Sequence, residues 1–201
     1  MARIAVIDSA ICNLRSVERA LATTGATAQV TGRAEDIESA DAIILPGVGA
    51  FESGMKHIAH LKDTIVSRVE GSDVPLLGIC LGMQMLFEES DEGGNIRGLG
   101  LLPGRVEKFS GDLKVPHMGW NSLSIKKPHP IMNGIDDGSY VYFVHSYRAN
   151  VSPYTVAASD YGGEFTAIVA NNRYNVVGTQ FHPEKSGDAG LKMLKNFVEM
   201  I

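Results

Sequence analysis

The chain has 201 residues, is 44% hydrophobic and carries a formal net charge of −5, which predicts one domain, residues 1–201, with a full hydrophobic core. The acidic balance and the lack of a Lys/Arg cluster argue against nucleic acid as a partner. The apolar run near the N-terminus is interrupted by Asp8 and is too short for a signal peptide or a membrane span. We therefore expect a cytoplasmic protein that does not bind membranes.

Only two cysteines are present, Cys12 and Cys80, which argues against a disulfide framework. Neither lies in the C-x-x-C spacing that indicates zinc. We therefore expect neither a metal nor a cofactor, and each thiol has to be interpreted from its own surroundings.

In the first half of the chain, short apolar runs alternate with helical patterns. Strands are predicted at 3–7, 27–30, 41–45 and 75–79, with helices at 14–21 and 58–69 between them. Alternation of this kind predicts an α/β fold, in which an open and mostly parallel sheet has helices on both faces.

The second half has a different texture, because Gly, Pro, Asn and Asp separate its apolar runs. Strands are predicted at 104–109, 121–125, 140–147, 155–159, 165–170 and 176–181. We expect additional mixed or antiparallel strands here, followed by an amphipathic helix at 190–201.

The segment "PLLGICLGMQMLFEES" places Cys80 between a buried strand and a helix-like stretch from Met83 to Phe87. Residues 78–82 form a G-x-C-x-G pattern, the thiol counterpart of the nucleophile elbow that holds its central residue in a strained, exposed turn. A helix N-terminus favours the thiolate form, and the N–H of Leu81 would point at a developing oxyanion. The alternative is a small buried cysteine packed beneath the helix.

A second signal is the late segment "GTQFHPEKS". If it continues a strand, His182 and Glu184 project to the same side, and Pro183 suits a strand end. A histidine held by a carboxylate is the base that a cysteine nucleophile requires. By itself the His-Pro-Glu segment could equally be a surface loop.

A third signal is "ADAIILPGVGAF", in which a strand runs into residues 46–49. Glycines at the carboxyl end of a parallel strand let backbone N–H groups approach a ligand, so the Val48–Gly49 stretch is a candidate second oxyanion donor. The alternative is a tight turn that only begins the next helix. The spacing matches neither a dinucleotide fingerprint nor a phosphate-binding loop.

In this order, the elbow, the Pro-Gly-Val-Gly loop and the late Phe-His-Pro-Glu segment resemble the class I glutamine amidotransferases, over essentially the whole chain. "NLRSV", "PHMGWN", "VHSY" and "FHPEKS" resemble those family members that serve a separate cyclase. "MGWN" argues against the glutaminases of pyridoxal phosphate synthesis, and Met83 stands where anthranilate-type glutaminases usually have histidine.

The resemblance implies that Cys80 attacks the side-chain carboxamide of L-glutamine. His182 then protonates the departing ammonia, serves next as base for thioester hydrolysis, and is oriented by Glu184. Leu81 and the stretch Val48–Gly49 would hold the oxyanion. The implied glutamine-binding residues are Gly49, Gln84, Glu92, His145, Ser146 and Tyr147.

The resemblance also implies a partner, a (β/α)8-barrel cyclase subunit that receives the ammonia in a heterodimer. The positions implied for the docking face and gate are Asn13, Ser16, Trp120, Asn121 and Lys185. Many relatives carry glycine directly before Asn13, where this chain has the segment Ser9-Ala10-Ile11-Cys12. This departure bears on the shape of the docking loop.

The sequence also allows other kinds of function. Asp8 after the first strand suggests a phosphorylatable receiver domain, but such a domain has Asp where this chain has Pro46 and Gly47. A cysteine hydrolase of esters or peptides fits the elbow, although Gln84 fits a carboxamide better. The spacing of His57 and His60 suggests a metal site without a third ligand, and a docking subunit without catalysis is disfavoured because all three triad residue types are present.

Overall fold

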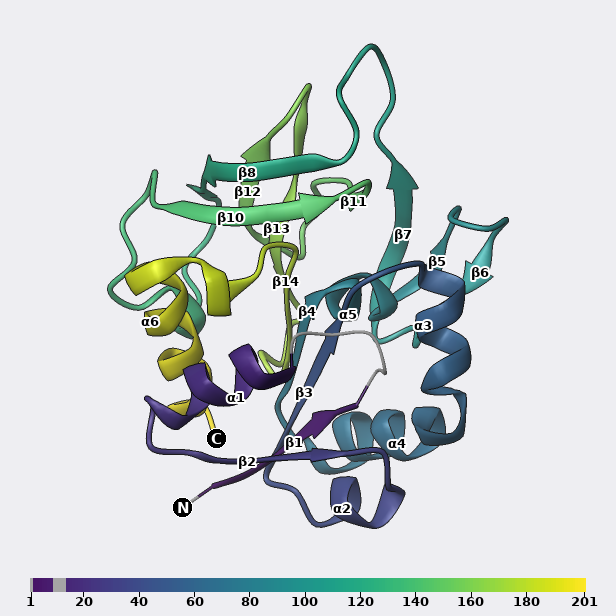
Figure 1. Ribbon diagram of the computed structural model, residues 1–201, viewed down its shortest axis with the longest axis vertical. Coiled ribbons are helices and arrows are strands. Elements are labelled where there is room, and N and C mark those ends of the chain that lie inside the picture. The colour runs from purple at the N-terminus through teal and green to yellow at the C-terminus, as the bar shows by residue number, and fades with distance from the viewer. Residues whose placement is uncertain (1, 9–13) are drawn as a thin grey trace.

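The computed structural model describes residues 2–8 and 14–201, and the elements are arranged as in Figure 1. The helices are α1 (Leu14–Ala22), α2 (Ala34–Glu38), α3 (Phe51–His57), α4 (Lys62–Ser72), α5 (Leu81–Met85) and α6 (Gly187–Val198), with 3₁₀ turns η1 (Ala59–Leu61), η2 (Pro130–Met132) and η3 (Pro183–Lys185). The strands are β1 (Arg3–Ile7), β2 (Thr27–Thr31), β3 (Ala42–Gly47), β4 (Leu76–Cys80), β5 (Phe87–Ser90), β6 (Ile96–Arg97), β7 (Leu102–Lys108), β8 (His117–Ser122), β9 (Ser124–Ile125), β10 (Tyr140–His145), β11 (Tyr147–Ala149), β12 (Thr155–Asp160), β13 (Glu164–Ala170) and β14 (Val176–Thr179).

The central sheet has eight strands in the order β2-β1-β3-β4-β14-β13-β12-β9. The strands from β2 to β14 pair in parallel, while β13, β12 and β9 add antiparallel pairs. The predicted fold class is confirmed: a mostly parallel α/β sheet with helices on both faces, extended by mixed strands from the second half.

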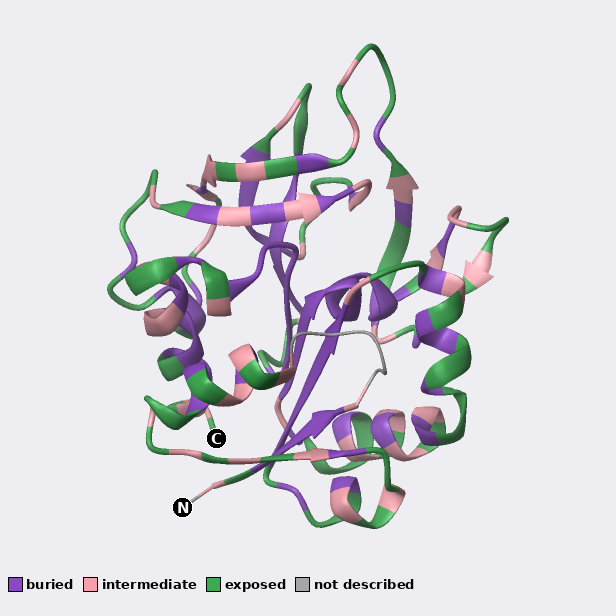
Figure 2. Cartoon of the chain, viewed as in Figure 1, coloured by how far each residue is buried: buried purple, intermediate pink, exposed green. Residues whose placement is uncertain are grey.

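The central strands consist mostly of buried residues (Figure 2). Along β1, Ile4 and Val6 belong to the core beneath α1 and α6, whereas Ala5 and Ile7 belong to the core beneath α2, α3 and α4. Successive residues of a strand face opposite sides. A strand covered on both sides therefore reads as a continuous apolar run, which is why "RIAVI" and "DAIIL" are recognisable in the sequence.

Two smaller sheets stand beside the central one. One is a ribbon of β8 and β10, and the other has the order β11-β7-β5-β6. The predicted strand at 140–147 is two strands. β10 ends at His145, Ser146 interrupts the extended backbone, and β11 joins the second small sheet. This break places Ser146 and Tyr147 at the junction between the two sheets.

The helical predictions need two corrections. The stretch 58–69 is not one helix, since α3 ends at His57, η1 follows and α4 begins at Lys62. The helix after Cys80 ends at Met85, and Phe87 begins β5 instead of continuing the helix. Phe87 is buried in either case, and a short apolar run cannot by its spacing alone distinguish helix from strand.

The two glycines of the elbow allow α5 to lie directly on the sheet. A Cβ atom on Gly78 would lie 2.7 Å from the backbone nitrogen of Met83, and one on Gly82 would overlap the carbonyl oxygen of Leu45. Neither neighbour is the flexible end of a side chain. The pattern is thus required by backbone-to-backbone packing.

Replacing Gly82 with alanine should lower the free energy of unfolding by about 2 kcal/mol or more, because the added methyl group must displace backbone. Gly71→Ala is the matched control, since Gly71 lies in α4 with open space around it, and it should raise that free energy by up to about 1 kcal/mol. Urea denaturation followed by circular dichroism measures both. Equal stability of the two variants would contradict this packing.

Candidate active site

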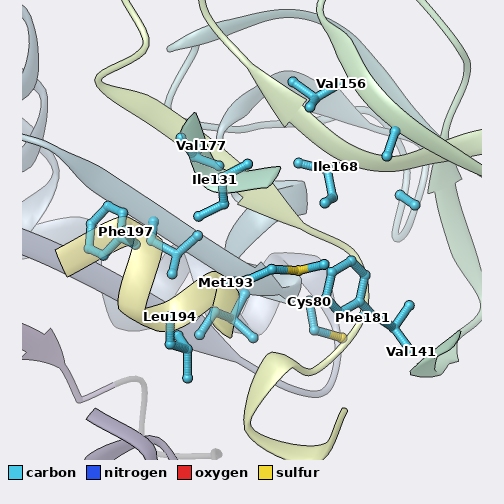
Figure 3. Packing of buried hydrophobic residues seen from close by; sticks show 14 of the residues in the cluster. Cys80, Ile131, Val141, Val156, Ile168, Val177, Phe181, Met193, Leu194 and Phe197 are labelled. Atoms are coloured by element: carbon cyan, nitrogen blue, oxygen red, sulfur yellow. The ribbon is translucent and has the colours of Figure 1, made fainter. Parts of the chain in front are cut away.

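Cys80 ends β4, a central strand paired in parallel with β3 and β14, and α5 begins at the next residue. Its backbone has φ +55° and ψ −110°, a conformation that L-residues rarely adopt and that surrounding structure must impose. The residue belongs to the core cluster drawn in Figure 3 and is 5% exposed. The predicted turn is present, whereas the expectation of an exposed thiol is wrong, since Cys80 is buried and lines a pocket.

His182 and Glu184 lie together, although the structure corrects the reason given by the sequence. β14 ends at Thr179, so these residues are not in a strand; Pro183 begins the turn η3 instead. The turn brings the carboxylate back to the ring, and Nδ1 of His182 lies 2.9 Å from Oε1 of Glu184. Their side chains are only 4% and 2% exposed.

The charge on His182 is set by its two neighbours. Burial by itself lowers the pKa of the imidazole, but the Cys80 thiol and the Glu184 carboxylate outweigh it and raise the pKa to about 9. Because Nδ1 faces a carboxylate, it carries the proton of the neutral ring. Nε2 is buried and has no hydrogen-bond partner of ordinary length among the described residues. Since the Cys80 thiol nevertheless raises the pKa of this ring, Nε2 is the nitrogen available to the sulfur.

Protonated His182 favours the folded state, since its pKa lies above the usual 6.5. The resulting stability is complete below about pH 6.5 and is lost as the pH rises through about 9.

A pocket of about 390 Å³ opens onto the sulfur. It is lined by Val48, Gly49, Cys80, Leu81, Gln84, Glu92, Pro116, Val144, His145, Ser146 and Tyr147. All residues that the resemblance implied for glutamine and its oxyanion therefore line one cavity, together with Pro116 and Val144, which sequence reasoning missed. The "PHMGWN" motif was a signal for Pro116, and the "VHSY" motif begins at Val144.

Glu92 and Tyr147 both line the pocket. Its Oε2 accepts a hydrogen bond of 2.9 Å from the N–H of Phe51, the first residue of α3, which ties Glu92 to the end of the Val48–Gly49 loop. Burial, followed by the negative charges of Glu92 and Asp91, raises the pKa of Tyr147. The negative charge of Glu92 therefore reaches Tyr147, the residue next to Ser146.

Gln84 is buried at the base of the pocket, and its amide nitrogen donates to the carbonyl of Tyr147 and to Oε1 of Gln180, both at 3.0 Å. The amide of Gln180 in turn lies 3.9 Å from the Cys80 sulfur. Sequence reasoning missed Gln180, although it stands two residues before His182 in the quoted segment. Gln84 thus faces the pocket while its donor group is engaged inside the protein.

The residues implied for partner docking fall on neighbouring elements, apart from Asn13, which lies outside the described residues, as do Ser9 to Cys12. Ser16 is on α1, Lys185 is on η3, and α1 packs against η3. Trp120 on β8 is 55% exposed. Asn121, by contrast, is partly buried, and its amide nitrogen donates to the carbonyl of Asp160 at 2.8 Å.

The paired histidines of α3 and η1 have backbone partners: Nε2 of His57 lies 3.0 Å from the carbonyl of Asp8, and Nε2 of His60 lies 3.1 Å from that of Gly32. Among the described residues, no cluster of three or more His, Cys, Asp or Glu side chains is suited to a metal ion. Within the same ranges, no helix is long and apolar enough to cross a membrane.

Comparisons with known proteins show the family of the chain. The model of the family "Glutamine amidotransferase class-I" matches residues 5–201. The chain is 54% identical to the imidazole glycerol phosphate synthase subunit HisH of Methanosarcina acetivorans, covering 100% of both chains. It is 49% identical to HisH of Methanocaldococcus jannaschii, covering 98% of this chain and 100% of that one.

A solved structure, that of PurLQS from Thermotoga maritima, has the same fold with a TM-score of 0.77 at 22% identity, covering 100% of this chain and 99% of that chain. The chain therefore belongs to the class I glutamine amidotransferase family. Within that family it belongs with the HisH glutaminase subunits of imidazole glycerol phosphate synthase.

The contribution of the sulfur to the charge on His182 is measurable. In Cys80→Ala the pKa of His182 should fall from about 9 toward its usual value, because burial continues to lower it while one of the two raising interactions is lost. Titration of the imidazole signals by NMR measures the change. The signal of His129 is the internal reference, since burial and Lys127 lower its pKa to about 4. A His182 pKa that stays near 9 would show that sulfur does not act on this ring.

Proposed function

We propose that Cys80 is the nucleophile of this glutaminase and attacks the side-chain carbonyl carbon of L-glutamine. The observation that carries the proposal is that the strained Cys80 lines the pocket while its thiol raises the pKa of a histidine held by a carboxylate. A new C–S bond converts the carbonyl into a tetrahedral oxyanion. Cleavage of the C–N bond then leaves a thioester on Cys80.

His182 moves the protons. With a pKa near 9 it is largely an imidazolium at neutral pH, so it can pair with the thiolate and donate a proton from Nε2 to the departing nitrogen, which leaves as ammonia. The neutral ring then removes a proton from water, which attacks the thioester and releases glutamate and the thiolate. Glu184 holds Nδ1–H and stabilises the imidazolium throughout.

The oxyanion would be held by the N–H of Leu81 and by an N–H of the Val48–Gly49 stretch, each typically contributing about 10²- to 10³-fold in rate. Gly49 has φ +94° and open space on its Cβ side, so backbone can approach the ligand closely. We assign Glu92 to the α-ammonium of glutamine and the backbone around Ser146 and Tyr147 to its α-carboxylate. Gln84 and His145 complete the binding region.

The partner we propose is a (β/α)8-barrel cyclase in a heterodimer. The cyclase would join the ammonia to a phosphoribosyl-ribulose intermediate, yielding imidazole glycerol phosphate and an aminoimidazole carboxamide ribotide in cytoplasmic histidine biosynthesis. Ser16, Trp120, Asn121 and Lys185 supply the docking face, to which the resemblance also assigns Asn13. The support is the name of the relatives, which marks each as a synthase subunit, and the exposed Trp120.

Glutamate release from glutamine, with and without the cyclase, tests the nucleophile. Cys80→Ala should lower the rate with cyclase present by at least about 10³-fold, because no other group in the pocket can form the thioester. Cys12→Ala is the matched control for loss of a thiol and should retain most activity.

Two outcomes would contradict the proposal. Substantial hydrolysis by Cys80→Ala would remove Cys80 as nucleophile. Productive ammonia transfer to an anthranilate or pyridoxal synthase, with none to the cyclase, would contradict the proposed partner.

A further inference from the structure

We propose that His117 and His145 form a relay of two neutral imidazoles that positions Tyr147 for glutamine binding, so that both are positioning residues of the reaction. The inference rests on the proposed function, because it assigns the mechanism by which the glutamine-binding segment is held. His117 had no role in the sequence-based prediction, and His145 was expected to contact the substrate.

The two histidines face each other across the ribbon of β8 and β10. In the antiparallel register His145 is the direct partner of His117, and Nδ1 of His117 lies 3.0 Å from Nε2 of His145. They are only 4% and 5% exposed. A short strand-to-strand contact between buried polar groups has to be a hydrogen bond, and one ring must donate to the other.

The carbonyl of Tyr147 sets the direction of this bond. It lies 2.8 Å from Nδ1 of His145, and since a carbonyl only accepts, Nδ1 of His145 carries the hydrogen. In a neutral ring Nε2 is then the acceptor, so Nδ1 of His117 must be the donor. Each tautomer follows from the one before it, and both ring nitrogens of His145 are engaged inside the protein.

Burial keeps both rings neutral. It lowers the pKa of His117 to about 4. It also lowers the pKa of His145 to about 3, although the hydrogen bond to the Tyr147 carbonyl raises it, and the electrostatic effects of His117, His182 and Arg148 lower it further. The ring of His117 is stacked between Phe143, at 5.0 Å, and Tyr161, at 4.2 Å between centroids. It can therefore neither gain a proton near neutral pH nor turn easily.

The outer end of the relay is also held. Nδ2 of Asn121 lies 3.4 Å from Nε2 of His117, a long contact in which the amide donates, and 2.8 Å from the carbonyl of Asp160. The Oδ1 atom of Asn121 accepts from the N–H of Ser122 at 2.8 Å. Both polar atoms of the Asn121 side chain thus have hydrogen-bond partners. Because its nitrogen donates to Nε2 of His117, Nε2 must be the acceptor and Nδ1 must carry the hydrogen.

The inner end meets the catalytic region. The Tyr147 carbonyl accepts from His145 and also from Gln84 at 3.0 Å, and Gln84 leads through Gln180 to the Cys80 sulfur. Two donors on one carbonyl fix the orientation of Tyr147, which lines the pocket. Loss of the relay should therefore weaken the binding of glutamine more than the chemistry at Cys80.

Imidazole ¹⁵N chemical shifts of the free chain at neutral pH give the first test. Both His117 and His145 should be neutral with the proton on Nδ1. An Nε2–H tautomer or a charged ring at either position would overturn the relay. These spectra need no turnover, so they decide the relay even if the chain proves not to hydrolyse glutamine, which would refute the proposed function instead.

Two variants of His117, measured with the cyclase bound, give the second test. His117→Phe keeps a ring between Phe143 and Tyr161 but removes the donor, whereas His117→Asn leaves a smaller side chain but places an amide N–H where Nδ1–H was. His117→Phe should raise the KM for glutamine about tenfold, the effect of one lost orienting hydrogen bond, with kcat within about twofold. His117→Asn should keep KM within about threefold of the unmodified chain.

A purely structural role for His117 predicts the opposite order, because the asparagine leaves a cavity among aromatic rings and the phenylalanine does not. An unchanged KM in His117→Phe, or a KM in His117→Asn above that in His117→Phe, would overturn the proposal. The rate of Cys80 alkylation by iodoacetamide should be the same in both variants, since the relay acts on substrate binding.

Discussion

The structure depends on one close contact, that of helix α5 lying on the central sheet with no side chain between backbones at Gly78 and Gly82. This contact allows β4 to end and the helix to begin at the next residue, and Cys80 takes the strained backbone conformation that joins them. The sulfur is thereby held at the carboxyl end of a parallel strand, where ligands of α/β proteins bind. The Val48–Gly49 loop follows the neighbouring strand β3 and lies at the same end of the sheet.

The three histidines near the pocket, His117, His145 and His182, differ in charge because their surroundings differ. His182 faces a carboxylate and a thiol, which raise its pKa to about 9, so it can hold and transfer a proton. His117 and His145 are surrounded by aromatic rings and backbone carbonyls, and burial keeps them neutral. Groups whose surroundings push their pKa values apart can have separate tasks: we assign proton transfer to His182 and positioning to the other two.

Much of the site could be predicted because it is local in sequence. The glycines around Cys80 and the pair His182 and Glu184 lie within five residues of one another in each case, although that pair meets through a turn instead of a strand. The contact between His117 and His145 depends on the register of β8 and β10, and that of Glu92 with Phe51 spans 41 residues. No periodicity specifies such pairings. The end of α5 was misplaced for a related reason, since burial of Phe87 suits helix and strand equally.

The central claim is that Cys80 forms a covalent thioester with the acyl group of glutamine. Rapid acid quenching of the complex with the cyclase during turnover, followed by digestion and mass spectrometry, tests it most directly. A glutamyl adduct is expected on the peptide that contains Cys80, and it should be absent when glutamine is omitted. An adduct confined to another residue, or steady glutamate release while no adduct forms in pre-steady-state samples, would contradict it.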